Sequence, residues 1–257
     1  MFKGGEIILN LLIKGLGIST FLMLGLGRSW LGTPAWGQTL TLEAGLTSLT
    51  SRTGESLLET SQAKADVLPL MSHFVTQINP AYCGVASSVM VLNALGVTTA
   101  NTPAWQRGYL NQDTIFTPQT NAVIDRHLIA HQGLTLSQLA EFLQTYPVTV
   151  ERYYGSDLGL AEFRQILGIS LGKANQYILV NYLRSSIGQE TGGHISPLAA
   201  YHAEQDQVLI LDVARYKYPP IWVSVQALWQ AMGTIDPVSG KSRGFLVIRN
   251  REPKAKN

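Results

Sequence analysis

The chain contains few cysteines and few charges. Only one of its 257 residues is a cysteine, so no intramolecular disulfide and no Cys-x-x-Cys zinc motif can form. Charged residues make up 14% of the sequence, the formal net charge is +2, and no basic patch carries interleaved aromatic residues. We therefore predict no metal site, no tightly bound cofactor and no nucleic-acid partner. The reactive group that stands out is the single thiol, Cys83.

The surroundings of Cys83 predict an activated nucleophile. A loop-forming Asn-Pro pair at 79–80 precedes it, Gly84 follows it, and apolar residues then recur every three or four positions, which is typical of a helix. Backbone N–H groups in the first turn of a helix have no partner, and they favour a thiolate over a thiol. Gln77 brings a side-chain amide that could stabilise an oxyanion. The alternative is a buried structural cysteine, because free cysteine packs as a small hydrophobe.

A nucleophilic thiol needs a base and a group that orients this base. Among the five histidines, His194 follows two glycines and precedes a strand-like run at 195–203. A polar turn leads to a second strand at 207–213, which is apolar except for Asp212. Because a buried carboxylate needs a partner, we expect the paired strands to bring Asp212 opposite His194. The alternatives are a salt bridge between Asp212 and Arg215 and a locally hydrogen-bonded loop histidine. No catalytic role is assigned to the other histidines, which are His73 in a strand-like segment, His127 and His131 on a helix, and His202 in solvent.

Five blocks of the sequence carry a resemblance to a known family. They are TQINPAYCGVAS (76–87), LNAL (92–95), TGGHISP (191–197), LILDVARYKYPPIWV (209–223) and GKSRGF (240–245). In these blocks the chain resembles the phytochelatin synthases, papain-like transpeptidases that act on glutathione. The resemblance implies Cys83 as nucleophile, His194 as general base and acid, and Asp212 as the orienting carboxylate, where papain has Asn. It also implies Gln77 as an oxyanion donor.

The resemblance also implies a reaction on glutathione, which is γ-Glu-Cys-Gly. The thiolate attacks the carbonyl of the cysteinyl–glycine bond, glycine leaves, and the γ-Glu-Cys group passes to water or to a second glutathione. Plant and yeast members carry a cysteine-rich C-terminal extension linked to metal response, which this sequence lacks, so we expect hydrolysis to dominate as in the short prokaryotic members. Heavy-metal ions such as Cd²⁺ would act through glutathione thiolate complexes. The alternatives are an exported papain-like peptidase with a different peptide substrate and a non-catalytic module that binds thiol peptides.

The γ-linked glutamate of glutathione carries a free ammonium and a free carboxylate, so its pocket needs one acid and one base. Asp236 and Arg243 flank a single hairpin loop and could supply this pair, since arginine binds carboxylates through two parallel hydrogen bonds. An ordinary salt bridge within the loop is the alternative. Arg215, three residues past Asp212, and Gly193 are further candidates for substrate contact.

Residues 1–37 do not resemble a part of the fold. Lys3 and Lys14 precede a short apolar stretch at 15–27, and residues 35–37 offer the small side chains that an export peptidase reads. The stretch is short for a membrane span. We predict a cleaved signal peptide and an exported, periplasmic or extracytoplasmic protein, with an uncleaved membrane anchor as the alternative.

Residues 38–257 are predicted to form one catalytic domain of the α+β class. Helical patterns lie at 83–95, 121–130, 136–144 and 160–167, and strand patterns lie near 147–153, 176–184, 195–203, 207–214 and 244–249. The resemblance implies a papain-like fold in which a helical part precedes an antiparallel sheet and the active site lies in the cleft between them. We predict no stable protein partner and leave a homodimer open.

Overall fold

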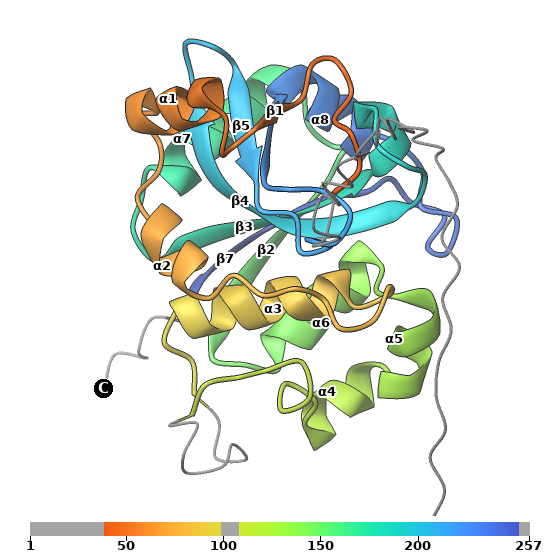
Figure 1. Ribbon diagram of the computed structural model, residues 1–257. Helices are drawn as coiled ribbons and strands as arrows, with labels where there is room; N and C mark the ends of the chain where they lie inside the picture. The colour runs from red at the N-terminus through yellow and green to blue at the C-terminus, as the bar shows by residue number, and fades with distance from the viewer. Residues whose placement is uncertain (1–38, 99–107, 252–257) are drawn as a thin grey trace, which may run out of the picture. The chain divides into compact units, whose positions relative to one another are not determined.

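The described strands pair into one antiparallel sheet, and the computed structural model describes residues 39–98 and 108–251 (Figure 1). The strands are β1 (Thr47–Ser48), β2 (Val148–Tyr154), β3 (Gln176–Leu183), β4 (Gly193–His202), β5 (Gln207–Ile210), β6 (Ile221–Ser224) and β7 (Gly244–Asn250). Their order across the sheet is β1-β6-β5-β4-β3-β7-β2. The predicted leader, residues 1–37, lies outside the described residues.

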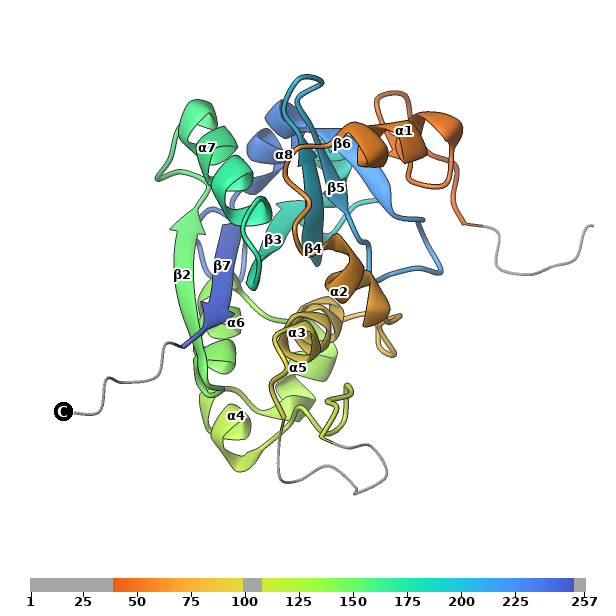
Figure 2. The same cartoon turned by 90° about the vertical axis from the view of Figure 1, so that its left-hand side faces the viewer.

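Helices cover both faces of this sheet. They are α1 (Arg52–Thr60), α2 (Val67–Ser72), α3 (Cys83–Ala94), α4 (Pro118–Val123), α5 (Arg126–Gln132), α6 (Leu136–Gln144), α7 (Leu160–Leu171) and α8 (Val225–Met232), with a 3₁₀ turn, η2 (Arg184–Ile187). Figures 1 and 2 show α3 and α6 on one side of the sheet and α7 and α8 on the other. None of the helices in the described part of the chain has the length and apolar character needed to cross a membrane.

The alternation of side chains along the central strands builds two hydrophobic cores. On β3, Tyr177 and Leu179 pack with the α3 side, while Ile178 and Val180 pack with the α7 and α8 side. Such alternation follows from the two-residue period of a strand. A strand buried on both faces reads as a nearly continuous apolar run, as β3 does.

Helix α3 is the central helix of the first core. Every residue from Cys83 to Asn93 is buried, so the helix has no solvent face, although its sequence repeats in a helical period. No side chain caps its N-terminus. It ends at Ala94, and Gly96 follows with a φ of +70°, a left-handed conformation that glycine adopts without strain. The uncapped first turn thus leaves its N–H groups available beside Cys83.

The α+β class and the antiparallel sheet are confirmed, with local differences. The helical pattern at 121–130 is two helices, because Asp125 leaves the helical conformation and accepts a hydrogen bond from the His127 N–H at the start of α5. The segment around His73 was predicted as a strand, but His73 caps the C-terminus of α2. Strand β5 ends at Ile210, short of the end of the predicted strand at 207–213, after an irregularity in its pairing with β4. The sequence patterns missed α1, α2, α8, η2, β1 and β6.

Candidate active site

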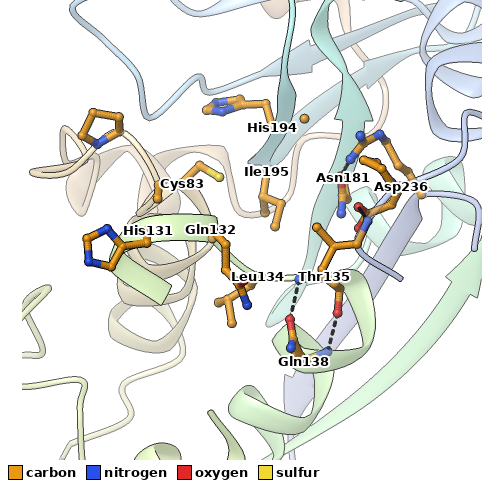
Figure 3. Close-up of a pocket in the computed structure, with 17 residues that line it drawn as sticks. Cys83, His131, Gln132, Leu134, Thr135, Gln138, Asn181, His194, Ile195 and Asp236 are labelled. Carbon is orange, nitrogen blue, oxygen red and sulfur yellow. Dashed lines mark hydrogen bonds between the residues drawn. The ribbon is translucent and has the colours of Figure 1, made fainter. Parts of the chain in front are cut away.

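A cavity of about 380 Å³ contains both Cys83 and His194 (Figure 3). Its wall comes from the N-terminus of α3, the α5–α6 connection, the facing ends of β3 and β4, and the loop before β7. Volumes of about 300–1,000 Å³ are typical of small-ligand pockets. The chain therefore places a thiol and an imidazole in a cavity that suits a small molecule.

Cys83 begins α3, and its side chain is only 8% exposed. Figure 3 shows the sulfur on the cavity side, near His194 and Ile195. Burial by itself would raise the pKa of the thiol. The hydrogen bond and charge of His194, together with the backbone N–H groups of Ile195 and Gly84, outweigh burial and leave the pKa of Cys83 below its ordinary value. These contacts therefore favour the thiolate over the thiol.

His194 lies on β4, where two acceptors hold one of its ring nitrogens. Its Nε2 lies 2.8 Å from Asp212 Oδ1 and 2.9 Å from Ser196 Oγ, which also accepts the N–H of Val213. This network assigns the proton to Nε2 and leaves Nδ1 for the thiol of Cys83. Burial would lower the pKa of His194, but the charge and hydrogen bond of Asp212 prevail and raise it. The imidazolium is therefore stabilised opposite the thiolate.

Asp212 is fully buried, and its charge partner is Arg184. The alternative pairing with Arg215 is wrong. Arg184 Nη2 donates to Oδ1 at 2.9 Å, and Nη1 lies 2.8 Å from Oδ2. The Ala214 N–H donates to Oδ1 at 2.8 Å. Burial would raise the pKa of Asp212, but His194 and then Arg184 lower it well below its ordinary range. Arg184 had escaped the sequence analysis, although an arginine directly after the apolar run of β3 was an available signal.

The far end of the cavity carries two opposite charges, Asp236 and Arg243, each about 7% exposed. Among the described residues no ion pair joins the two, so the predicted alternative of an ordinary loop salt bridge is not seen. Arg243 Nη1 donates to Asn181 Oδ1 at 3.2 Å, while its buried Nε has no partner within the described residues. Gly193, at the start of β4, lies directly against the guanidinium. Burial lowers the pKa of Arg243, and the charges of Asp236 and Cys83 offset this only partly.

Comparison of the sequence with known proteins identifies the family to which the chain belongs. Residues 37–245 match the family model for phytochelatin synthase. The chain belongs to the phytochelatin synthase family. It is 36% identical over 179 residues to glutathione gamma-glutamylcysteinyltransferase 3 of Lotus japonicus, which is 70% of this chain and 36% of that protein.

Other members of the phytochelatin synthase family are similar over the same share of the chain. Glutathione gamma-glutamylcysteinyltransferase 1 of Arabidopsis thaliana is 35% identical over 186 residues, which is 72% of this chain and 37% of the relative. The enzyme of the same name from Schizosaccharomyces pombe is 28% identical over 179 residues, or 70% of this chain and 42% of the relative. The matched part spans little more than a third of the plant proteins.

Gln77 was predicted as the oxyanion donor of this phytochelatin synthase family member. It lies beside the cavity and not in its wall. Its Nε2 donates to the carbonyl oxygens of Asn79 at 3.0 Å and Pro80 at 2.9 Å, and it lies 3.1 Å from the hydroxyl of Tyr216. Both amide hydrogens are therefore used to hold the loop that precedes Cys83. The oxyanion role of Gln77 stays a prediction.

Arg215, the other candidate for carboxylate contact, lies outside the cavity wall. It is exposed, and its guanidinium lies 4.6 Å from the ring centroid of Phe74. This cation–π contact gives Arg215 a packing role on the surface. Its predicted role in substrate binding stays untested.

The structure adds to what the sequence indicated about two further histidines. His202 was expected in solvent, but it is 4% exposed, with Nε2 3.0 Å from Thr60 Oγ1 and Nδ1 accepting the N–H of Gln205. His131 lies on α5 as predicted and also reaches the cavity wall. Within residues 39–98 and 108–251, no cluster of three or more histidine, cysteine, aspartate or glutamate residues is arranged to hold a metal ion.

Proposed function

We propose that this chain is a thiol acyltransferase and hydrolase that removes glycine from glutathione through a γ-Glu-Cys acyl-enzyme on Cys83. The observation that carries the proposal is the pair of buried charges at Asp236 and Arg243, which share a cavity with Cys83 and His194. Asp236 accepts the N–H of Val238 and Arg243 donates to Asn181, but neither has an ion-pair partner among the described residues. Buried charges without a counter-charge are costly, so such a site favours a ligand that brings the opposite charges. The γ-linked glutamate of glutathione offers an ammonium for Asp236 and a carboxylate for Arg243.

Acylation follows from the chemistry of the parts. With the glutamyl end held at Asp236 and Arg243, the Cys83 thiolate attacks the carbonyl carbon of the cysteinyl–glycine bond. The developing oxyanion is stabilised by N–H groups in the first turn of α3, and we assign the same role to Gln77 after a rearrangement of its amide. One such donor typically contributes about a hundred- to a thousandfold in rate. The His194 imidazolium gives its proton to the departing glycine nitrogen, and a thioester remains on Cys83.

Deacylation uses the neutral imidazole that this step leaves behind. His194 takes a proton from water, and the product is γ-glutamylcysteine, or it takes one from the amine of a second glutathione, and a longer γ-Glu-Cys peptide forms. Either acceptor attacks the thioester carbonyl, and Cys83 leaves as the thiolate. Heavy-metal ions such as Cd²⁺ enter as part of the substrate, as complexes with the glutathione thiol. We expect water to be the main acceptor.

The papain-like arrangement fits this chemistry, because the nucleophile starts a buried helix and the base lies on the facing sheet. We further propose that the chain is exported and that residues 1–37 are its signal. A mature N-terminus near Gln38, measured by mass spectrometry of protein from the exported fraction, would support this proposal, and a retained Met1 would contradict it.

The deciding experiment incubates the purified protein with glutathione and follows free glycine and product masses. We expect glycine release, a γ-Glu-Cys adduct on Cys83 after acid quenching, and no release by Cys83→Ser. The isomer with an α-linked glutamate is the matched control, because it displaces both charged groups from Asp236 and Arg243. Equal cleavage of the two isomers would indicate a general peptidase. Binding of glutathione without glycine release would indicate a non-catalytic module.

A further inference from the structure

Arg184 connects the catalytic carboxylate to a second, fully buried layer of polar groups. It lies at the start of η2, is 4% exposed, and contacts both carboxylate oxygens of Asp212. Its Nη1 also donates to Gln189 Oε1, and its guanidinium lies 5.2 Å from the ring centroid of Tyr218. The Tyr218 hydroxyl in turn accepts the N–H of Glu190. These contacts hold the guanidinium against both carboxylate oxygens of Asp212, of which Oδ1 also contacts His194 Nε2.

The charge of Arg184 is important because Asp212 is buried, and a buried carboxylate has a strong effect on the protonation of His194. A buried carboxylate on its own would stabilise the imidazolium so strongly that it would become a poor proton donor to the leaving glycine. It would also oppose a thiolate on Cys83, since both groups are negative. An arginine that contacts both carboxylate oxygens cancels this negative charge and leaves the hydrogen bond to Nε2 intact.

We propose that Arg184 is a positioning residue that makes Asp212 act on His194 as a neutral hydrogen-bond acceptor, and thereby sets the pH range over which thiolate and imidazolium coexist. The effect of this pH range on glycine release rests on the proposed function. The pH range over which the Cys83 thiolate is present does not depend on it. The side chain reaches no reacting atom. It acts through Asp212, which it holds at the angle that points Oδ1 at His194.

The ionisable groups that face Arg184 are Tyr182 of β3, His194 of β4, Asp212 after β5, Tyr218 in the following loop and Cys83 of α3. Helix α8 also packs against η2 and carries no ionisable side chain. Burial raises the pKa of Tyr182 far above its ordinary value, so this phenol stays neutral at working pH. Asp212 is therefore the permanent anion of the cluster, and Arg184 is its permanent cation.

The sole cysteine of the chain makes the proposal directly measurable. The rate of alkylation of Cys83 by iodoacetamide as a function of pH reports the thiolate without any need for turnover. Loss of a nearby cation raises the pKa of every group it faces, so Arg184→Gln should move the midpoint of the alkylation profile to higher pH. Arg184→Lys keeps the charge and should leave the midpoint in place, but its single ammonium cannot hold both carboxylate oxygens. We expect this variant to lose roughly tenfold in kcat/KM.

The matched control is Arg164→Gln. Arg164 makes a comparable two-point pair with Asp206, at 2.9 and 2.6 Å, in a partly exposed position outside the cavity wall. Its removal should leave the midpoint unchanged. A midpoint for folded Arg184→Gln that equals that of Arg164→Gln would overturn the proposal.

The double variant Arg184→Gln/Asp212→Asn keeps the proposal testable if the single variant does not fold. It removes one charge of each sign, so no uncompensated charge is buried and the net charge of the cluster is preserved. We expect its alkylation midpoint to return close to that of the unaltered chain. A double variant whose midpoint differs as much as that of Arg184→Gln, or a folded Arg184→Lys whose midpoint moves with it, would contradict the neutral-acceptor role. If the midpoints behave as expected but glycine is not released, the proposed function fails and this inference stands.

Discussion

Gly193 leaves the space that the Arg243 guanidinium occupies. A Cβ atom built on Gly193 would lie 2.6 Å from Arg243 Nη1, closer than real Cβ contacts allow, and 3.1 Å from its Cζ, which is a tight contact. Gly193 also pairs with Leu183 where β3 and β4 meet, so the backbone cannot easily move away. The start of the strand that carries His194 thereby sets the position of a charge at the far end of the same cavity.

Gly193→Ala should therefore displace Arg243 and weaken substrate binding. Because a hydrogen bond to a charged group contributes about 1.5–3 kcal/mol, a displaced Arg243 should raise KM for glutathione on the order of tenfold or more, with a smaller change in kcat. The stability should change little, since the guanidinium is the free end of a flexible side chain. Steady-state kinetics test this, with Gly168→Ala on α7 as the control, because nothing lies within 4 Å of a Cβ there. An unchanged KM in Gly193→Ala would contradict the contact.

Arg243→Gln and Asp236→Asn should each impair glutathione use far more than folding. A hydrogen bond to a charged group is worth about 1.5–3 kcal/mol, or roughly ten- to a hundredfold in kcat/KM. The thermal midpoint should stay near that of the unaltered chain, because each variant removes a buried charge that has no ion-pair partner within the described residues. Comparing kinetics with thermal unfolding checks this. A loss of stability as large as the loss of kcat/KM would show a structural role for the pair.

The contribution of Asp212 to stability should depend on pH. Burial opposes the carboxylate, but His194 and Arg184 hold its folded-state pKa far below the ordinary value of about 3.9. A group with a depressed pKa stabilises the fold above its unfolded-state pKa, and this contribution is lost as the pH falls toward the folded-state pKa. Asp212→Asn should therefore cost about 3–5 kcal/mol at neutral pH, because Arg184 loses its counter-charge.

Urea unfolding of both chains between pH 7 and pH 3 measures this difference. Asp212 also raises the pKa of His194, so the gap in unfolding free energy between the unaltered chain and Asp212→Asn should grow as the pH falls through the His194 titration. It should then shrink below about pH 4, where Asp212 begins to take up its own proton. A gap that does not shrink below about pH 4 would contradict the depressed pKa of Asp212.

Asn93 should be important for stability and irrelevant to chemistry. At the C-terminal end of α3, its side chain donates to the Leu110 carbonyl and accepts the Leu110 N–H, both at 2.9 Å. Asn93→Ala leaves both of these buried backbone groups without partners, at about 1–3 kcal/mol each. Denaturant unfolding should show a total loss of about 2–6 kcal/mol, with Cys83 alkylation unchanged at low denaturant.

The control for this prediction is Asn250→Ala. Asn250 donates to the Leu95 carbonyl at 3.3 Å from an exposed position, so its removal should change stability by about 0.5 kcal/mol or less. Equal losses in Asn93→Ala and Asn250→Ala would show that the buried pairing at Leu110 carries no special weight.

The sequence predictions were accurate where the signal comes from neighbouring residues, and inaccurate where the structure depends on segments far apart in the sequence. Helix α6 was predicted with its observed bounds, because Thr135 caps it in a capping box with Gln138 and its apolar face repeats over two turns. The end of β5 was placed too late, because an apolar run does not show where its neighbour β4 becomes irregular. His202 was misplaced for a similar reason, since α1, which buries it, went unrecognised.

The sequence by itself determined that a thiol would begin a helix after a Pro-containing loop, that a histidine would lie where a strand begins, and that one carboxylate would be buried beside it. These features depend on residues within a few positions of one another. Only the tertiary structure decided that Arg184 and not Arg215 neutralises Asp212, that Gln77 holds a loop, and that Asp236 and Arg243 line the cavity without an ion pair between them. The choice of partner for a buried charge depends on which strand ends meet in space, and this is set by the packing of the whole sheet.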